Sequence, residues 1–311
     1  MQSVGRRGQK TLETVLGGDS GIRTRQFALQ PPGVFSLDAQ GLNEAFEREA
    51  PLLANSALEK ALAKVDMSAV ELDAMFVCTC TGYLCPGVSS HLAEKAGVRE
   101  DAHLQDIGGL GCGAAIPTLQ AASCYLAANP DATVAVVAVE ICSAAFFLCD
   151  DPGVLISACL FGDGASASIW TGRGSAGDWR ASGFHSLHRP VHRERIRFVN
   201  QGGYLRNQLH RDVPSLAADA VGELFQRAAI VPDAVIAHPG GRDVIEALED
   251  RLGLPLVETR RVLAEYGNLS SPSVMVALEQ RLLMEYPGQL LWLTAFGAGF
   301  AAYCCQIQRK P

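Results

Sequence analysis

Apolar and polar residues alternate along this chain with two periods, and together they predict a layered α/β protein. Buried strands are expected where apolar, β-branched or aromatic residues form short runs, at residues 72–79, 104–107 and 133–139. The last run is almost continuously apolar, which is typical of a parallel strand covered on both faces. Apolar residues recur at helical spacing over 42–63 and 88–96, although Pro51 predicts two helical pieces in the first segment. Residues 1–20 show only a weak helical pattern, and a further strand is expected within 155–170.

The second part of the chain repeats this order of elements. A glycine-rich break at 171–178 is the candidate boundary, so we divide the chain into residues 1–173 and 174–311. Strands are expected at 179–187 and 290–294, with a hairpin over 196–209 that turns at Gly202 and Gly203. A short apolar strand at 234–237 ends in His238, and a helix is expected from 243 to 252.

The most unusual stretch is 104–117, where an apolar run ends in glycines and a cysteine stands at the turn. No charged residue occurs from Cys112 to Asn129, which predicts a helix buried on all sides. Pro117 falls in the first turn of that helix, where a missing N–H is tolerated. A thiol at a helix N-terminus is expected to favour its thiolate form, because the free N–H groups and the helix dipole stabilise negative charge. The alternative is that Cys112 is a small apolar core residue, the usual role of a free cysteine.

Composition limits the classes of protein. Hydrophobic residues make up 48% of the chain and charged residues 19%, as in a globular protein with a large core. The net charge of -7 argues against nucleic acid as a partner. We expect no membrane span, because no apolar run reaches about 18 residues. The basic N-terminus lacks the apolar stretch of a secretory signal, so the ten cysteines are expected to be free thiols in the cytoplasm.

A nucleophilic cysteine needs a base, and His238 is the best placed of the seven histidines. It stands at the carboxyl end of an apolar strand, where reactive groups of α/β sheets gather, although a hydrogen-bonded structural histidine is an open alternative. Asn268 precedes another predicted helix, and its alternative is an N-cap. Cys78, Cys80 and Cys85 could in principle bind a metal, but no fourth ligand follows at a usual spacing.

Four motifs together make this chain resemble the type III polyketide synthases, the chalcone synthase-like branch of the thiolase fold, and in particular the bacterial alkylpyrone and alkylresorcinol synthases. They stand in the family's order at Gly111–Gly113, Leu160–Ala165, His238–Gly241 and Tyr266–Ser271. The resemblance implies a thiolase-like layered αβαβα fold of two similar halves. The first half carries the nucleophilic cysteine, and the second carries the histidine and the asparagine.

By that resemblance Cys112, His238 and Asn268 form a catalytic triad, and Phe161 matches a gatekeeping aromatic residue. Cys80, Ala145 and Ser270 are expected in the substrate cavity, where small side chains would leave room for medium or long acyl starters. Cys85 belongs to a loop that reaches towards the partner in a homodimer. The implied reaction is iterative decarboxylative condensation of malonyl-CoA units onto an acyl starter held on Cys112, followed by cyclisation to a pyrone or resorcinol. No metal or redox cofactor is implied.

Three departures from the family pattern leave alternatives open. Only about twenty residues precede Gly21, where the family has a further strand and loop. Asp19 and Leu12 stand near the places of the basic residues that bind coenzyme A in plant members, so a carrier-protein thioester is an alternative substrate. The family's final glycine-rich loop is looser here, at residues 295–299. The alternative functions are a single-condensation ketoacyl synthase and a catalytically silent acyl-binding homologue.

Overall fold

The computed structural model describes residues 4–174 and 178–310, in which helices and strands alternate. The helices are α1 (Arg6–Gly17), α2 (Ala39–Lys64), α3 (Val88–Ala96), α4 (Ala115–Ala128), α5 (Pro152–Leu160), α6 (Val213–Ala228), α7 (Arg242–Leu252), α8 (Val257–Tyr266) and α9 (Ser273–Leu282). The strands are β1 (Ala74–Cys78), β2 (His103–Ile107), β3 (Thr133–Glu140), β4 (Gly164–Thr171), β5 (Trp179–His188), β6 (Ile196–Gln201), β7 (Tyr204–Leu209), β8 (Ala234–Ala237), β9 (Leu290–Gly297) and β10 (Ala301–Arg309).

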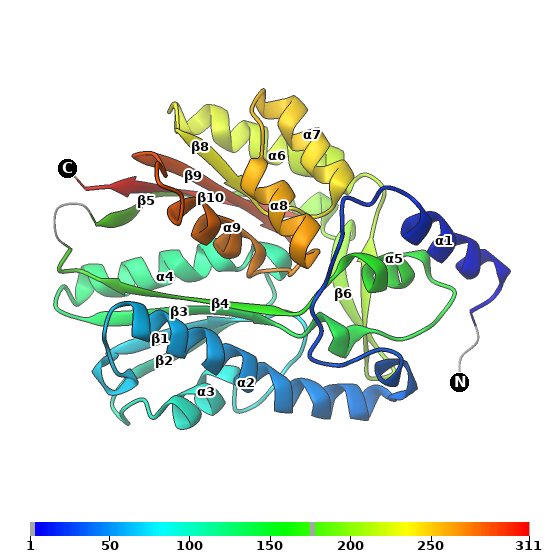
Figure 1. Cartoon of the computed structure of the whole chain (residues 1–311), viewed down its shortest axis with the longest axis horizontal. Coiled ribbons are helices and arrows are strands. Elements are labelled where there is room, and N and C mark those ends of the chain that lie inside the picture. The colour runs from blue at the N-terminus through cyan, green and yellow to red at the C-terminus, as the bar shows by residue number, and fades with distance from the viewer. Residues whose placement is uncertain (1–3, 175–177, 311) are drawn as a thin grey trace.

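These elements form five layers (Figure 1). Helices α2 and α3 cover the outer face of one sheet, and α6 and α7 cover the outer face of the other. Helices α4 and α9 lie between the two sheets, and one apolar cluster joins them to strands of both. The predicted αβαβα layering is therefore confirmed.

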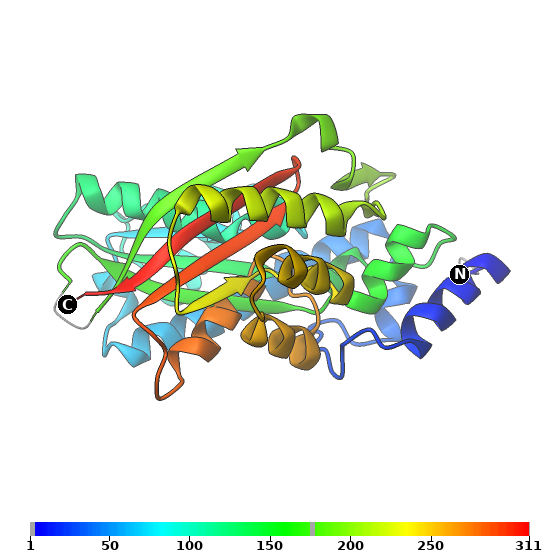
Figure 2. The same ribbon diagram turned by 90° about the horizontal axis from the view of Figure 1, so that it is seen from above.

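The first sheet has the strand order β2-β1-β3-β4, and the second has the order β5-β10-β9-β8. In the first sheet β1 runs parallel to β2 and β3, whereas β4 is antiparallel to β3. In the second sheet β8 runs parallel to β9, whereas β10 is antiparallel to both of its neighbours (Figure 2). The predicted hairpin at Gly202 and Gly203 is β6–β7, a separate two-stranded sheet.

Three buried strands explain why the candidate site lies where it does. Every residue of β1 is buried, as is every residue of β3 after Thr133, because helices cover both faces of the first sheet. In the second sheet the parallel strand β8 is likewise buried after Ala234. The carboxyl ends of parallel strands, where reactive side chains gather, then point to the region between the two halves.

Some helix predictions were wrong. Helix α2 runs without a break through Pro51, because a long buried stripe that includes Phe46, Ala50, Ala54 and Leu58 compensates for the roughly 3 kcal/mol that an internal proline costs. Helix α4 is fully buried only towards its N-terminal end, and Gln120 and Cys124 are exposed. A helix, α5, occupies the start of the predicted strand region 155–170, and α1 forms where only a weak pattern was visible.

Candidate active site

Cys112 lies in a tight turn between β2 and α4, at the contact between the two halves of the chain. The turn is a 3-10 helix over Gly111–Gly113, and Gly111 has φ +59°, which a glycine adopts without strain. The turn packs directly on the end of β9, since a Cβ atom on Gly297 would lie 2.3 Å from the carbonyl oxygen of Leu110 and 3.1 Å from the backbone nitrogen of Cys112. Cys112 is 6% exposed, so its thiol is buried between the halves.

His238 follows the last residue of β8 and is almost completely buried. Its backbone N–H donates to the carbonyl oxygen of Thr294 at 2.9 Å, which continues the pairing of β8 with β9. The imidazole lies edge-on to the ring of Phe296, with 5.2 Å between centroids. Its Nδ1 has no hydrogen-bond partner among the residues that the structure describes. An unpartnered buried nitrogen is costly, and this one is free to bond to a substrate.

Asn268 is held by bonds to both halves. The backbone N–H of Asn268 donates to the carbonyl of Leu160, and the carbonyl of Asn268 accepts from the N–H of Gly162. These two bonds form an isolated parallel bridge between Asn268 and Phe161. Its side-chain nitrogen donates to the carbonyl of Gly240 at 2.8 Å, and its side-chain oxygen accepts from the N–H of Ser270 at 2.8 Å. Helix α9 begins only at Ser273, with Pro272 at the N-cap position, so Asn268 is not an N-cap.

Ser270 connects the predicted residues into one site. Its Oγ lies 3.3 Å from the Cys112 sulfur and 3.3 Å from the Cys80 sulfur, while its N–H bonds to Asn268. The backbone of Ser270 also lies next to the His238 imidazole. Its hydrogen bond to the imidazole raises the pKa of His238 and so partly offsets the lowering caused by burial. The left-handed φ of Ser270, +58°, costs on the order of 1 to 3 kcal/mol in a residue other than glycine. The structure therefore brings Cys112, His238, Asn268 and Cys80 together around a strained serine.

Glu140 is a buried carboxylate in this site that the sequence analysis did not single out. Its Oε2 accepts the N–H groups of Cys80 and Thr81 at 2.9 and 3.0 Å and the Thr81 hydroxyl at 2.8 Å. Its Oε1 accepts the hydroxyl of Ser271 at 2.5 Å and that of Ser270 at 3.3 Å. A visible signal was present, because Glu140 is the one charged residue between Asp131 and Asp150 and ends an apolar strand.

Burial controls the protonation of Cys112 and His238. It raises the pKa of the Cys112 thiol to about 12, although the hydrogen bond from Ser270 opposes the rise, and the charge of Glu140 supplies a smaller part of the rise. Burial also lowers the pKa of His238 to about 3. The expected resting thiolate is therefore wrong. Cys112 precedes the first residue of α4 by three positions, and the cost of burying its charge exceeds what the helix end supplies.

Phe161 and Ala145 line one small void, and Cys80 is not among the residues that line it. The void has a volume of about 10 Å³, close to the space of one water molecule, and its walls include Cys142, Phe146 and Phe198. Of the small side chains at positions 142–145, Cys142 and Ala145 thus line this void. Gly162 is required next to Phe161, since a Cβ there would lie 2.6 Å from the carbonyl of Tyr266.

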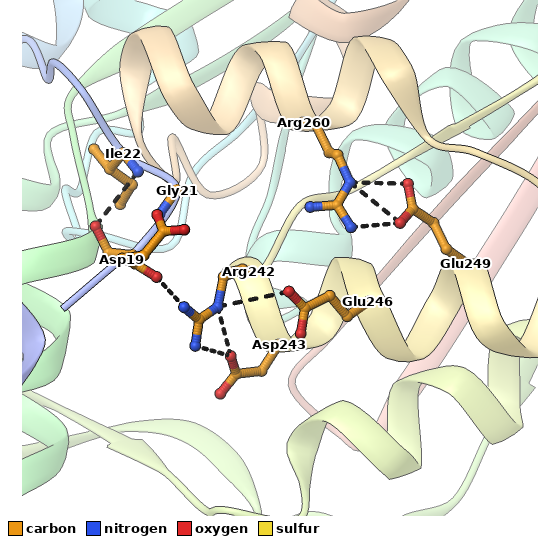
Figure 3. A network of polar contacts seen from close by, with 9 residues as sticks. Asp19, Gly21, Ile22, Arg242, Asp243, Glu246, Glu249 and Arg260 are labelled. Atoms are coloured by element: carbon orange, nitrogen blue, oxygen red, sulfur yellow. Dashed lines mark hydrogen bonds and ion pairs between the residues drawn. The ribbon is translucent and has the colours of Figure 1, made fainter.

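The remaining predicted residues lie at the surface or at the edge of the site. Cys85 is exposed, and Tyr83 beside it is 79% exposed. Within the described ranges, no group of three or more ligating side chains is placed to hold a metal ion, and Cys78, Cys80 and Cys85 do not form one. The backbone carbonyl of Asp19 accepts a hydrogen bond from the Arg242 guanidinium, which also forms ion pairs with Asp243 and Glu246 at the start of α7. Figure 3 shows this network beside the Arg260–Glu249 pair.

No helix in the described part of the chain combines the length and the apolar character that crossing a membrane requires.

Comparisons with known proteins agree with this geometry. Residues 11–189 match the family described as FAE1/Type III polyketide synthase-like protein, and residues 231–309 match the 3-Oxoacyl-(acyl-carrier-protein) synthase III C terminal family. The chain is 32% identical over 310 residues to the 1,3,6,8-tetrahydroxynaphthalene synthase of Streptomyces peucetius, with 91% of this chain and 80% of the relative covered. It is 29% identical over 315 residues to the 3,5-dihydroxyphenylacetyl-CoA synthase of Streptomyces toyocaensis, with 93% and 80% covered.

The crystal structure of the 1,3,6,8-tetrahydroxynaphthalene synthase of Streptomyces coelicolor superposes with a TM-score of 0.86 at 25% identity, over 98% of this chain and 89% of that one.

Proposed function

Because the chain belongs to the FAE1/type III polyketide synthase-like family and is a condensing acyltransferase, we propose that Cys112, His238 and Asn268 perform its reaction. The observation that carries the proposal is the cluster around Ser270, which joins the nucleophile of one half to the histidine and the asparagine of the other. The reaction is iterative decarboxylative condensation of malonyl units onto an acyl starter, followed by cyclisation.

In the loading step, the Cys112 thiol attacks the carbonyl carbon of an acyl thioester. The thiol is protonated at rest, so its proton passes to the neutral imidazole of His238 as the sulfur attacks. The carbon–sulfur bond of the starter thioester breaks, and the departing thiolate takes up the proton. Cys112 then holds the acyl group, and His238 is neutral again.

In the extension step, a malonyl thioester loses carbon dioxide and leaves an enolate. The enolate oxygen needs donors, and two are available in this site. One N–H of the Asn268 amide bonds to Gly240, which leaves the second free, and Nδ1 of His238 is a donor in the neutral tautomer that carries its proton there. These donors stabilise the developing negative charge as an oxyanion hole does. The enolate carbon attacks the carbonyl carbon of the Cys112 thioester, and the bond to the cysteine sulfur breaks. The released thiolate takes up a proton from solvent, and the extended chain, now on the thioester that carried the malonyl unit, is transferred back to Cys112 as in the loading step.

We propose a short acyl starter, carried as a coenzyme A thioester. The void beside Phe161 holds about one water molecule, which disfavours the medium and long chains expected from the small side chains at 142–145. Each step uses only the thiol, the imidazole, the amide and the thioesters, so the proposed reaction includes no cofactor. The ten cysteines are free thiols, as is usual in a reducing compartment, and we propose a cytoplasmic location.

We further propose a homodimer in which the exposed loop at Cys85 meets the partner. The outer strand β2 supports this, because His103, Leu104 and Gln105 are all exposed although a parallel strand is ordinarily covered. Light scattering at micromolar concentration is expected to give twice the mass of the chain, and a monomer would contradict the proposal.

A single-condensation ketoacyl synthase is the second candidate, since residues 231–309 match a family of that kind. One assay separates the functions. The enzyme is incubated with radiolabelled malonyl-CoA and acyl-CoA starters of increasing length, and the products are identified by mass spectrometry. Cyclised polyketides support the proposed function, a single ketoacyl product supports the second candidate, and binding without turnover indicates a silent homologue. Repeating the assay with malonyl carrier protein tests the form of the thioester.

A further inference from the structure

Asn207 is a buried amide at the void beside Phe161, and the reaction proposed above gives it no role. It lies on β7 directly opposite Phe198 of β6, so both side chains lie on the same face of the hairpin. Its exposed fraction is 7%, and it lines the void together with Ser157 of α5. The remaining walls are apolar side chains and the thiol of Cys142. A buried amide in an apolar wall is costly unless it is hydrogen-bonded, so its partners decide what the void can hold.

A chain of hydrogen bonds fixes the orientation of this amide. The Ser157 hydroxyl donates its single hydrogen to the carbonyl oxygen of Gly153 at 2.6 Å. The Ser157 oxygen must therefore act as the acceptor in its 2.9 Å contact with Asn207, and only the amide nitrogen can donate to it. The nitrogen of Asn207 thus faces Ser157, and the amide oxygen, Oδ1, occupies the other branch of the side chain.

Oδ1 of Asn207 is an acceptor that the protein leaves unused. No donor in the described part of the chain bonds to it, and it is not fully enclosed by protein atoms. A group of the size of water can therefore reach it, and Asn207 lines a space of that size, the void. The protein presents a fixed acceptor there and needs the occupant to supply the donor.

The void adjoins the groups that hold and extend the acyl chain. Phe161 lines it, and the main chain of Phe161 is bridged to Asn268. Cys142 also lines it, and this thiol is close enough to Cys112 for the two to interact electrostatically. The void, with its acceptor, is therefore part of the surroundings of a chain carried by Cys112.

Two kinds of acyl chain meet this acceptor differently. A 3-oxoacyl thioester, the product of one condensation, enolises between its two carbonyl groups and then carries a hydroxyl that can donate. A saturated chain of the same length carries only C–H groups, so it displaces water from Oδ1 and leaves the oxygen without a donor. An acceptor that loses its partner in this way disfavours the saturated chain by about tenfold or more.

We propose that Asn207 is a specificity-determining residue whose Oδ1 accepts a hydrogen bond from the enol hydroxyl of a 3-oxoacyl chain. The proposal rests on the condensation proposed above and adds a substrate class to it. No covalent bond changes in this contact. A site of this kind takes up its own condensation product in preference to a new saturated starter, so the hydrogen bond favours another extension over the start of a new chain.

A matched pair of four-carbon starters tests the proposal. Acylation of Cys112 by acetoacetyl-CoA is compared with acylation by butyryl-CoA, below saturation, by intact-protein mass spectrometry. A 3-oxo group also activates a thioester chemically, so the measure is the change of this preference between variants. Asn207→Leu keeps the size of the side chain without the acceptor, and the preference should fall about tenfold. Asn207→Asp keeps an acceptor, to which the Ser157 hydroxyl can turn, and the preference should stay within about threefold of the parent.

The outcomes separate this proposal from the proposed function. Equal changes with both starters in Asn207→Leu, or an equal fall of the preference in Asn207→Asp, would overturn the proposal. Asn207→Val gives the same comparison if Asn207→Leu does not retain the circular dichroism spectrum of the parent. Added malonyl-CoA tests the reaction separately, since acylation without extension in the parent contradicts the proposed function while the starter preference still tests Asn207. Absence of any adduct on Cys112 in the parent would overturn both.

Discussion

Replacing Glu140 with glutamine should make the protein less stable and its nucleophile more reactive. Glu140 accepts bonds from two backbone N–H groups at Oε2 and from the hydroxyls of Ser270 and Ser271 at Oε1. In Glu140→Gln the amide oxygen can replace Oε2, and the amide nitrogen then faces the two hydroxyls. Hydroxyl groups rotate to accept, so the fold is retained while the charge is lost.

The loss of stability follows from the two backbone hydrogen bonds that keep their geometry in Glu140→Gln but lose the charge on their acceptor. A hydrogen bond to a charged group contributes about 1.5 to 3 kcal/mol, and one to a neutral group about 0.5 to 1.5 kcal/mol. For the two backbone donors, Cys80 and Thr81, the difference amounts to about 2 to 3 kcal/mol. Urea denaturation should show this decrease. The exposed control Glu47→Gln on α2 should change stability by no more than about 0.5 kcal/mol.

The gain in reactivity follows from the electrostatics at Cys112. Glu140 Oε1 and the Cys112 sulfur are joined through Ser270 by two contacts of 3.3 Å, and the carboxylate charge raises the pKa of the thiol. At about 7 Å and an effective dielectric constant of about 20, one charge contributes roughly 2 kcal/mol. Its removal should increase the thiolate fraction at a given pH by about tenfold or more.

Iodoacetamide alkylation of Cys112, followed by peptide mass spectrometry between pH 7 and 10, measures that fraction. The folded variant should react about tenfold faster than the parent at each pH below the thiol pKa. Alkylation at an unchanged or lower rate in a variant with a native circular dichroism spectrum would refute the electrostatic account. Unchanged stability would refute the hydrogen-bond account separately.

The other predictions concern the proposed triad and the void. Cys112→Ser should abolish the covalent acyl adduct in intact-protein mass spectrometry without changing the fold, and a full adduct would show that another residue is acylated. Asn268→Ala should slow malonyl decarboxylation about 100- to 1000-fold while starter loading changes much less; equal losses in both steps would indicate a structural role. Burial lowers the pKa of His238 from 6.5 to about 3, so between those values the unfolded state binds the extra proton and stability falls as the pH falls. Urea denaturation at several pH values should show that His238→Gln removes a slope of up to about 1.4 kcal/mol per pH unit in that window, and an identical slope in both proteins would contradict this. Phe198→Ala should enlarge the void beside Phe161 and shift kcat/KM towards longer starters, whereas an unchanged length profile would show that the void does not select the starter.

Local patterns were sufficient to find the residues that stand at turns. Cys112 stands in a glycine-containing turn that follows a strand, and His238 follows a strand and precedes such a turn; this order is visible without any tertiary information. The layering was also predictable, because an uninterrupted apolar strand such as β3 requires cover on both faces. Asn268 was found through its motif, and only the structure shows that it is bonded to Gly240 and Ser270 and is not an N-cap.

What could not be predicted depends on contacts between distant segments. Ser270 joins the nucleophile of the first half to a loop 158 residues later in the chain, and no local pattern encodes that distance. The protonation state of Cys112 was predicted wrongly because burial, which raises its pKa, is a tertiary property, whereas the helix end is a local one. The continuous α2 likewise depends on the sheet beneath it, which supports a helix that Pro51 would otherwise interrupt.

The backbone bridge between Phe161 and Asn268 restricts how the site can open. The N–H of Asn268 bonds to Leu160 and its carbonyl accepts from Gly162, so the main chain on both sides of Phe161 is fastened to the residue that is proposed to stabilise the enolate. A shift of the main chain at Phe161 would displace that donor as well. If Phe161 acts as the gate, it must therefore open by rotation of its side chain alone, and the oxyanion-binding geometry stays assembled during each admission of substrate.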